Sequence, residues 1–508
     1  MKGELLPVSA EIRRWDQETI AAGTPGITLM RRAGQAIAGR ILAEPRWRSP
    51  RPILVLCGPG NNGGDGYVVA TLLAAEGRAV QVAATPGRPG GDAAIAAGEW
   101  TGAVLSLEAA DPGAAALVVD ALFGTGLGRD LEGAVADLVG RVDASGTDVL
   151  SIDIPSGIDA DSGLVRGVAI KAGWTVALAA RKPGHLLYPG RLHAGRVEVA
   201  DIGIPAGIAR GSGVATVANA PALWLASLPR IGLLGHKYDR GHAVVLSGGP
   251  AHTGAARLAA RGALRAGAGL VTLVTSARAL SVNAAHLTAI MLRVCDEPDE
   301  LSDLLTDDRF NAVALGPALG VGEVSRRWVE AALEADRATV LDADALTSFA
   351  GEARALADLT GAGRESPVVL TPHEGEFARL FRGDATLGSD PAAEPSRLVR
   401  ARKAAAFAGA TVVLKGPDTV IAAPDGRAAI NENGSPYLAT AGSGDVLAGV
   451  IAGLLAQGMP AFEAASAAVW MHAAAATRFG PGLISEDLPE LLPEILRDLA
   501  YEAGRETT

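Results

Sequence analysis

Cysteine is nearly absent from this chain of 508 residues. Cys57 and Cys295 are its two cysteines, and they lie in separate regions without a CxxC spacing. This excludes a disulfide framework and gives no indication of a zinc site. Aromatic residues are also scarce, at 4% of the chain, although 49% of it is hydrophobic. An interior packed by Ala, Val and Leu is therefore expected, which is typical of layered α/β domains.

The sequence also lacks a block of basic residues, and its formal net charge is -11. Because a polyanion would find no positive surface, we expect no nucleic-acid partner. No apolar run is long and uninterrupted enough to cross a bilayer, and no basic-then-apolar leader is present at the N-terminus. These absences favour a cytoplasmic enzyme that acts on small molecules and does not associate with a membrane. Apolar α/β surfaces of this kind often associate, so we expect a homo-oligomer.

Short apolar runs alternate with helix-length segments in two series along the chain. The first series is 52–57, 79–83, 117–121, 148–152, 174–178 and 196–199, and the second is 243–247, 271–275, 312–315, 339–341, 368–370 and 411–414. Strands that alternate with helices form parallel sheets covered on both faces. The alternation is lost over 205–228, which predicts two α/β domains, 1–215 and 225–508. The first should be a Rossmann-like three-layer α/β/α domain, with a helix over 9–44, and 383–397 should be a polar loop.

Three polar, glycine-rich segments follow strands of the first series. They are GPGNNGGDG at 58–66, DALFGTGLGRD at 120–130 and DIPSGIDAD at 153–161. The carboxyl ends of parallel strands share one edge of the sheet, so these loops should converge on one crevice. The first segment is not GxGxxG, which disfavours a standard dinucleotide fold. Its Asn and Asp oxygens suit ribose hydroxyls or a monovalent cation. Each segment alone could be an ordinary turn capped by Asp or Ser.

Together with LMRRAG at 29–34, these segments resemble the YjeF N-terminal domain, the NAD(P)H-hydrate epimerase, over nearly all of residues 9–205. The resemblance implies that Asp153 is the catalytic acid facing the hydrated ring. It also implies that the substrate contacts Asn61, Asn62, Gly63, Gly64, Asp65, Gly124, Thr125, Gly126, Leu127, Gly128, Arg129 and Asp130. Epimerisation at C6 requires the C–O bond to break and re-form, or the ring to open. A carboxylate beside that carbon can move the proton and stabilise positive charge.

The same resemblance implies a potassium ion bound by Asn62, Asp120 and Ser156. One charge among neutral oxygens suits a large monovalent ion better than magnesium, which demands a tight octahedron. The alternative is that Asp120 merely caps the following turn while Ser156 ends a strand.

In the second half, GSGD at 442–445 precedes a long apolar stretch, 446–455. Free amides at a helix N-terminus and the helix dipole favour an anion there. An aspartate at this place would repel a resident phosphate, which indicates a base acting on a hydroxyl beside a phosphoryl group in transfer. We expect Asp445 to be the only carboxylate of this phosphate cradle. An ordinary glycine-rich turn before a core helix is the alternative for GSGD taken alone.

Other segments that follow strands of the second series are GPALG at 316–320, DADAL at 342–346, TPHEGE at 371–376 and KGPDTV at 415–420. Lys415 could meet a phosphate as a point charge. A lone histidine is more often structural, but the setting of His373 in a strand-end loop favours a site role.

Together these segments resemble the ribokinase-like YjeF C-terminal domain, the ADP- or ATP-dependent NAD(P)H-hydrate dehydratase, over about residues 229–500. The resemblance implies that Asp445 is the catalytic base and that magnesium enters with the nucleotide. It implies that the hydrated dinucleotide contacts Ala255, Ala318, His373 and Asp445. It implies that ADP or ATP contacts Lys415, Gly416, Pro417, Asp418, Thr419 and Gly444. Ala318 stands where the family pattern has glycine.

The function that follows is repair of damaged nicotinamide nucleotides by two activities on one chain. One would interconvert the R- and S-hydrates, and the other would phosphorylate and expel the C6 hydroxyl of the S-hydrate. A kinase for a small vitamin precursor such as hydroxymethylpyrimidine is an alternative, although such a kinase needs no first domain. A non-catalytic binding protein is another, but retention of Asp65, Asp120, Asp153 and Asp445 disfavours it. Between the two clefts, we expect substrate to diffuse through solvent.

Overall fold

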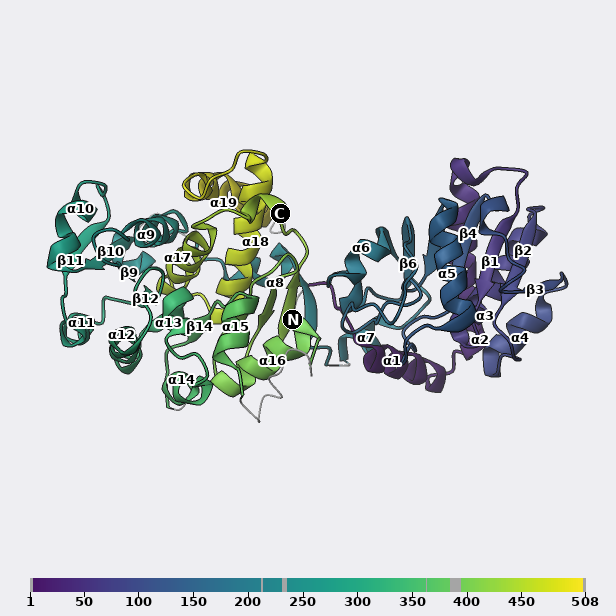
Figure 1. The fold of residues 1–508 in the computed structure, drawn as a ribbon, viewed down its shortest axis with the longest axis horizontal. Coiled ribbons are helices and arrows are strands. Elements are labelled where there is room, and N and C mark those ends of the chain that lie inside the picture. The colour runs from purple at the N-terminus through teal and green to yellow at the C-terminus, as the bar shows by residue number, and fades with distance from the viewer. Residues whose placement is uncertain (1–2, 212, 231–234, 362, 384–393, 506–508) are drawn as a thin grey trace. The chain divides into compact units, whose positions relative to one another are not determined.

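The computed structural model describes residues 3–211, 213–230, 235–361, 363–383 and 394–505. Most of the loop predicted over 383–397, namely 384–393, lies outside the described residues. The chain divides into two compact units. One spans Leu5–Thr216, and the other spans Val217–Thr508 together with Met1–Glu4. Figure 1 labels their helices and strands.

The first unit contains a seven-stranded sheet in the order β3-β2-β1-β4-β5-β6-β7, with every neighbouring pair parallel. Its strands are β1 Ile53–Cys57, β2 Val80–Ala84, β3 Val104–Ser106, β4 Leu117–Ala121, β5 Val149–Ile152, β6 Trp174–Leu178 and β7 Arg196–Ala200. The strand order reverses between β1 and β4. Crevices that bind ligands form at the carboxyl ends of strands at such a switch point.

Helices cover both faces of this sheet, as the alternation of β1 side chains demonstrates. Ile53 and Val55 pack in a cluster with α2 and α3, whereas Leu54 and Leu56 pack in a second cluster with α5. The helices are α1 Ser9–Ala21, α2 Gly26–Ala43, α3 Asn61–Ala75, α4 Gly91–Glu99, α5 Gly133–Ser145, α6 Gly190–Ala194 and α7 Ala206–Gly211, with the short helices η1 Pro45–Trp47, η2 Pro112–Ala114 and η3 Pro183–His185. The predicted three-layer α/β/α domain is confirmed.

Two local predictions in this unit are wrong. The single helix expected over 9–44 is two helices, because Gly23 adopts a φ of +104° and Pro25 precedes α2. The segment NNGGDG is the first part of α3, not a loop. Its glycines allow close packing: a Cβ at Gly63 would overlap the backbone of Gly58, and one at Gly64 would overlap Met30.

The second unit contains a ten-stranded sheet in the order β11-β10-β9-β12-β13-β14-β15-β16-β17-β8. Its strands are β8 Thr216–Asn219, β9 His242–Leu246, β10 Leu270–Thr275, β11 Met291–Val294, β12 Ala312–Leu315, β13 Ala338–Leu341, β14 Val368–Leu370, β15 Thr411–Leu414, β16 Val420–Ala422 and β17 Ala428–Asn431. The pairs from β11 to β15 are parallel, while β16 and β17 pair antiparallel beside them. The predicted α/β class is confirmed here too.

The helix that follows GSGD lies at the centre of this unit. Helix α17, Ser443–Ala456, is buried along its length and packs on α9, Gly254–Arg265. A Cβ at Gly449 would overlap the carbonyl of Ala259, so glycine permits this close approach.

The other helices of this unit are α8 Pro221–Trp224, α10 Leu280–Ala284, α11 Pro298–Leu305, α12 Glu323–Glu334, α13 Ala343–Thr347, α14 Ala353–Thr360, α15 Glu374–Leu380, α16 Arg397–Ala408, α18 Ala461–Phe479 and α19 Asp487–Arg505, with η4 Leu225–Ser227, η5 Lys237–Arg240, η6 Ala277–Ala279 and η7 Pro436–Leu438. Among the described residues, no helix combines the length and apolarity needed to cross a membrane.

Candidate active sites

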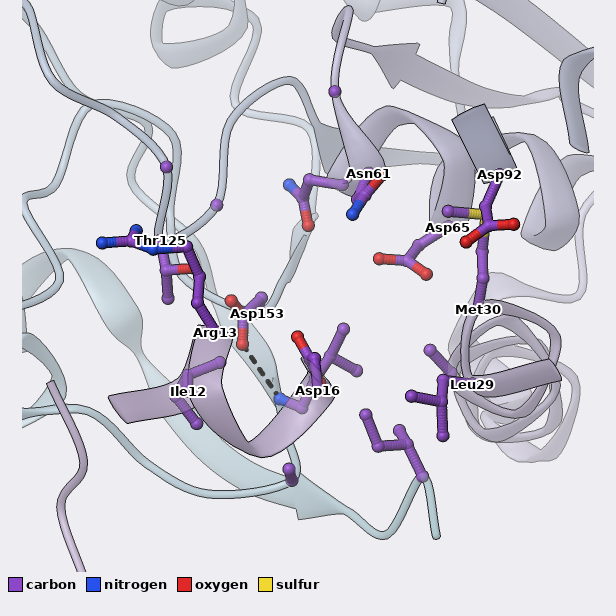
Figure 2. Close-up of a pocket in the computed structure, with 18 of the residues that line it drawn as sticks. Ile12, Arg13, Asp16, Leu29, Met30, Asn61, Asp65, Asp92, Thr125 and Asp153 are labelled. Carbon is purple, nitrogen blue, oxygen red and sulfur yellow. Dashed lines mark hydrogen bonds between the residues drawn. The ribbon is translucent and has the colours of Figure 1, made fainter. Parts of the chain in front are cut away.

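The first unit has a cavity of about 470 Å³ at the carboxyl ends of β1, β4 and β5. Figure 2 shows acidic side chains from separate elements pointing into it. The predicted site residues that line it are Asn61, Asn62, Asp65, Gly124, Thr125, Gly126 and Asp153. Those that do not line it are Gly63, Gly64, Asp120, Leu127, Gly128, Arg129, Asp130 and Ser156. The three motifs therefore converge as predicted, but the far end of the second motif lies outside the cavity wall.

Asp153 directly follows β5 and is held by a buried lysine. Its Oδ1 forms an ion pair with Lys182 Nζ and accepts a hydrogen bond from the backbone N of Leu178 at 3.1 Å. Lys182 is completely buried, and its Nζ also donates to Leu178 O at 2.9 Å. Asp153 itself has a φ of +69°, in the left-handed region that non-glycine residues rarely occupy. Strained backbone of this kind occurs frequently at functional sites.

His185 holds the backbone of both residues of this ion pair, Asp153 and Lys182. Its Nδ1 accepts from Lys182 N at 2.9 Å, so its Nε2 carries the proton and donates to Asp153 O at 2.8 Å. Burial, reinforced by the charge of Lys182, lowers the pKa of His185 to about 4, so the ring is neutral. Sequence reasoning missed Lys182 and His185. A signal was present, because RKPGH follows the predicted strand 174–178 as the other motifs follow theirs.

Three further carboxyl groups face the cavity, those of Asp16, Asp65 and Asp92. Burial raises the pKa of Asp65 well above its usual value, and repulsion from Asp153 and Asp16 adds to this. Burial also raises the pKa of Asp16 to about 6, helped by Asp153 and opposed by Lys182. Asp16 was missed because it lies in a helix rather than in a motif. It nevertheless shares the buried face of α1 with Ile12 and Thr19, where a carboxyl group is unusual.

The predicted potassium ligands Asp120 and Ser156 are in direct contact. Asp120 is completely buried, and its Oδ1 accepts from Ser156 Oγ at 2.5 Å and from Leu122 N at 3.3 Å. Its Oδ2 accepts from Ser156 N and from Ser151 Oγ, both at 2.8 Å. The hydrogen bond from Leu122 N agrees with the alternative that Asp120 caps the following turn. Burial raises the pKa of Asp120, and the hydrogen bonds from Ser156, Ser151 and Leu122 oppose this increase without cancelling it. None of these three partners carries a positive charge. The buried Nδ2 of Asn62 has no hydrogen-bond partner among the described residues.

In the second unit, α17 begins inside GSGD, as predicted. Gly442 precedes the helix with a φ of +88°, and Asp445 lies in the first turn. Burial raises the pKa of Asp445 to about 6, repulsion from Asp342 adds to this, and Lys415 opposes it. The expectation that Asp445 is the only carboxylate of the cradle is wrong, because β13 delivers Asp342 to the same place. A Cβ at Gly444 would lie 3.5 Å from Lys415 Nζ and 3.9 Å from Asp342 Oδ2.

Lys415 is therefore a paired cation rather than an isolated point charge. Its Nζ lies 2.7 Å from Asp342 Oδ1 and 3.9 Å from Glu376 Oε2. Burial acts to lower the pKa of Lys415, but Asp342 and Glu376 outweigh it and raise that pKa. Sequence reasoning named the segment of Asp342 without giving the residue a role. Its position directly after a buried strand was the available signal.

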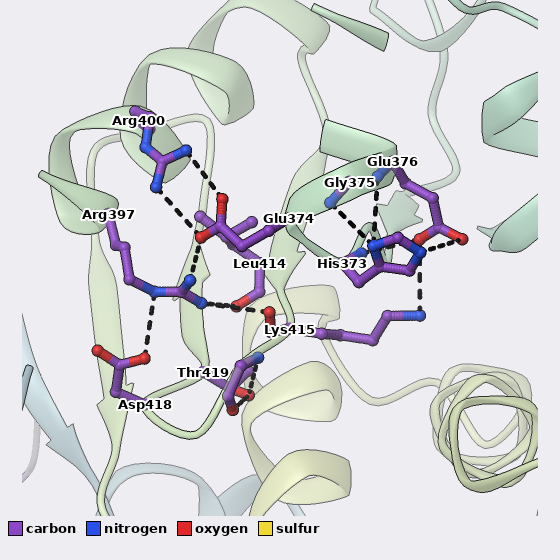
Figure 3. Close-up of polar contacts among 11 residues, drawn as sticks. His373, Glu374, Gly375, Glu376, Arg397, Arg400, Leu414, Lys415, Asp418 and Thr419 are labelled. Atoms are coloured by element: carbon purple, nitrogen blue, oxygen red, sulfur yellow. Dashed lines mark hydrogen bonds and ion pairs between the residues drawn. The ribbon is translucent and has the colours of Figure 1, made fainter. Parts of the chain in front are cut away.

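The predicted nucleotide loop, 415–419, is tied down by α16 (Figure 3). Arg397 forms ion pairs with Glu374 and with Asp418, the latter at 3.2 Å from Nε. Its Nη2 donates to the carbonyl oxygens of Leu414 and Lys415, each at 3.2 Å. Within the loop, Thr419 Oγ1 donates to Gly416 O at 2.7 Å and accepts from Gly416 N at 3.1 Å. Pro417 lies between these anchored residues.

Of the predicted contacts of the hydrated dinucleotide, His373 and Ala318 follow strands of this unit, whereas Ala255 and Asp445 lie in the first turns of helices. His373 follows β14 and caps α15, since its Nδ1 accepts from Gly375 N at 2.9 Å and Glu376 N at 3.3 Å. Its ring is half exposed, and its Nε2 lies 3.4 Å from Glu376 Oε1. Ala255 lies in the first turn of α9. Ala318 has a φ of +57°, which explains physically why glycine is favoured at this position.

Known proteins resemble this chain across both units. The family model "NAD(P)H-hydrate dehydratase" matches residues 243–496, and the model "YjeF-related protein N-terminus" matches residues 26–184. A bifunctional NAD(P)H-hydrate repair enzyme of Thermofilum pendens is 36% identical over 517 residues, covering 96% of each chain. That of Moorella thermoacetica is 38% identical over 507 residues, covering 94% of each chain.

A solved structure, the ADP/ATP-dependent NAD(P)H-hydrate dehydratase of Bacillus subtilis co-crystallised with ATP and Mg²⁺, is 31% identical. It covers 56% of this chain and 98% of its own, with a TM-score of 0.49. The relatives match across both units, and the family predicted from the motifs is confirmed. The chain belongs to the family of bifunctional NAD(P)H-hydrate repair enzymes.

Proposed function

We propose that this chain repairs hydrated NADH and NADPH in two steps, one in each unit. The first unit interconverts the R- and S-hydrates at C6. The second converts the S-hydrate to the reduced nucleotide at the expense of ADP or ATP. The observation that carries the proposal is the position of Asp445 in the first turn of α17, with Lys415 and Asp342 beside it. Both units would work on small molecules, and a cytoplasmic location and a homo-oligomeric state stay predictions.

In the dehydratase step, Asp445 removes the proton of the C6 hydroxyl, and the oxygen attacks the terminal phosphorus of the nucleotide. The phosphorylated oxygen then leaves as phosphate, driven by the ring nitrogen lone pair, which gives a C6=N1⁺ bond. Loss of a proton from C5 then restores the dihydropyridine double bond and neutralises the ring nitrogen. A carboxyl pKa of about 6 suits this base, because at neutral pH it is ionised and still basic. The amides at the start of α17 stabilise the charge on the transferring phosphoryl group. A magnesium ion bound with the nucleotide would add positive charge there, and the Asp342 carboxylate is a donor of the type that magnesium prefers.

In the epimerase step, we propose that Asp153 faces C6, because its carboxylate lines the cavity and Lys182 keeps it in place. Positive charge that develops on the ring would be stabilised by this carboxylate. A potassium ion held by Asn62, Asp120 and Ser156 is also proposed. Its charge would offset that of Asp120, which is buried without a cation among its partners. The ion would hold the three motifs together without taking part in a chemical step.

The test is incubation of separated R- and S-hydrates with the purified protein, ADP, Mg²⁺ and K⁺, followed at the reduced-nicotinamide absorbance. Both epimers should be converted, the R-hydrate only after epimerisation, and spontaneous epimerisation is subtracted from a protein-free control. Without ADP, interconversion should continue while dehydration stops. A protein that left both hydrates unchanged but phosphorylated hydroxymethylpyrimidine would be a vitamin-precursor kinase. One that did neither would be a binding protein.

A further inference from the structure

Helix α1 brings Asp16 to the wall of the epimerase cavity in a fixed position. Ile12 and Trp15 of the same helix are buried beneath it. The start of the helix is anchored from a distance, because Asp161 Oδ1 accepts from Ser9 N at 2.6 Å and from Ser9 Oγ at 2.8 Å. Asp161 belongs to the third motif, so the segment that supplies Asp153 also sets the position of Asp16.

Asp16 is better placed than Asp153 to exchange a proton. Asp153 Oδ1 is engaged by Lys182 and by Leu178 N. In contrast, Asp16 has neither a hydrogen bond nor an ion pair within the part of the chain that the structure describes. Its side chain is partly buried and points into the cavity (Figure 2). A carboxyl group that is free, partly desolvated and exposed to a ligand can donate and accept a proton without breaking a structural contact.

The charges around Asp16 come from every side of the cavity. Asp153 and Lys182 face it from the loops after β5 and β6, Asp65 from α3 and Asp92 from α4, and Arg13 lies on its own helix. Burial is the main reason that the pKa of Asp16 rises to about 6, with Asp153 adding to it and Lys182 opposing it. Both protonation states are thus populated close to neutral pH.

We propose that Asp16 is a catalytic residue of epimerisation, the acid that protonates the C6 oxygen of the hydrated nicotinamide and the base that recovers that proton. This deepens the proposed epimerase function and rests on it. The protonated carboxyl of Asp16 donates to the C6 hydroxyl, the C6–O bond breaks, and water leaves. The ring nitrogen lone pair forms a C6=N1⁺ bond, which the Asp153 carboxylate stabilises. Water then adds to the opposite face of C6 and returns a proton to Asp16, so that no atom or electron is gained or lost.

The experiment compares the full-length protein with the variants Asp16→Asn and Asp16→Glu, and with the control Glu18→Gln. Glu18 is an exposed residue of the same helix. Interconversion of the R- and S-hydrates is measured without ADP from pH 5 to 9, and dehydration of the S-hydrate with ADP is measured in parallel. We expect Asp16→Asn to lower kcat for epimerisation about 100-fold with KM nearly unchanged, as for loss of a general acid. In the unsubstituted chain, kcat/KM for epimerisation should decline above about pH 6, where the acid form of Asp16 is lost, and this decline should be absent in Asp16→Asn. Asp16→Glu should restore part of the rate.

Dehydration by all three variants should equal that of the unsubstituted chain, which shows that the second unit is intact. Circular dichroism and a thermal melt report whether the first unit is folded. A folded Asp16→Asn variant that keeps its epimerase kcat, or that changes KM alone with an unaltered pH profile, overturns the catalytic role. An unsubstituted chain that fails to accelerate interconversion at all overturns the proposed epimerase function instead, and Asp16 then has no such reaction to catalyse.

Discussion

At the scale of single residues, Asp445 shows how burial turns an ordinary carboxyl group into a base for neutral pH. Its pKa of about 6 arises first from burial and then from repulsion by Asp342, while Lys415 limits the increase. The same three residues surround the place where a phosphoryl group would be transferred. A carboxylate with an unshifted pKa would be a weaker base there by about 100-fold in proton affinity.

We predict that Asp445→Asn lowers S-hydrate dehydration by at least about 10³-fold, since general base catalysis of this kind contributes ~10²–10⁴-fold. Epimerisation should be unaffected. In the unsubstituted chain, dehydration should rise as pH increases through about 6, because the base must be ionised. The measurement is kcat with ADP and purified S-hydrate from pH 5 to 8.

The melting temperature of Asp445→Asn distinguishes a catalytic defect from misfolding of the variant. The folded chain binds the Asp445 proton more tightly than the unfolded chain does, because the folded pKa is raised. That contribution to stability is present below about pH 4 and is lost as pH rises through about 6. Asp445→Asn should therefore melt at a higher temperature than the parent at pH 8. A variant that dehydrates the S-hydrate at the parental rate would remove Asp445 from the mechanism.

The residues that sequence could identify are those that lie in a motif at a strand end or at the start of a helix, such as Asp153 and Asp445. The contacts between such residues could not be predicted, even where both members of a pair lie in segments that follow strands. Lys182 reaches Asp153 across 29 positions of sequence, and Lys415 reaches Asp342 across 73. Such pairings depend on which strands are neighbours in the sheet, and a single sequence does not specify strand order.

At the scale of secondary structure elements, most buried strands were predictable, but the buried strands β16 and β17 were not. Of the strands at sheet edges, β7 was predicted, whereas β3, β8 and β11 were not. Strands such as β1 and β12 are continuous apolar runs because helices cover both faces of the sheet. Strands β3 and β11 lie at sheet edges and expose part of their side chains, so they give no apolar run. The start of α3 was missed for a different reason, because its glycines are used for close packing within a helix rather than for a turn.

Helix α16 positions the nucleotide loop through Arg397, and this gives a prediction at the scale of elements. Arg397→Met should raise KM for ADP about 10-fold, because contacts to the carbonyl oxygens of Leu414 and Lys415 and to buried Asp418 are lost at the start of the loop and within it. The matched control is Arg400→Met one turn later. Arg400 contacts Glu374 at 2.9 and 3.1 Å and, within the described part of the chain, forms no hydrogen bond or ion pair with the loop. Dehydration kinetics at varied ADP concentration measure both variants.

Arg397→Met also leaves Asp418 without this partner in the interior, which should lower the melting temperature of the second unit. Kinetics are therefore compared well below that temperature, where the variant is folded. KM for the S-hydrate should change much less than KM for ADP. Equal ADP affinities in the Arg397→Met and Arg400→Met variants would contradict a specific role for Arg397 in holding the loop.

At the scale of the whole molecule, each candidate site is built within one compact unit. The cavity with Asp16 and Asp153 draws all its residues from Leu5–Thr216, and the cradle with Asp445 draws its residues from Val217–Thr508. The loss of α/β alternation over 205–228 marked the connection between the two series. It did not predict β8, which contributes a short strand to the second sheet.

Because each site is complete within its unit, the two activities should complement each other when they are on separate molecules. Asp153→Ala should stop enzymatic interconversion of the hydrates but spare dehydration of the S-hydrate, and Asp445→Asn should do the reverse. With a mixture of the R- and S-hydrates, ADP and Mg²⁺, Asp153→Ala alone should convert the S-hydrate quickly and the R-hydrate at the spontaneous rate. Adding Asp445→Asn should restore complete conversion at a rate that grows with its concentration, since the S-hydrate passes through solvent. A mixture that leaves the R-hydrate at the spontaneous rate, although each variant retains its own activity, would show that substrate must be handed over within one molecule.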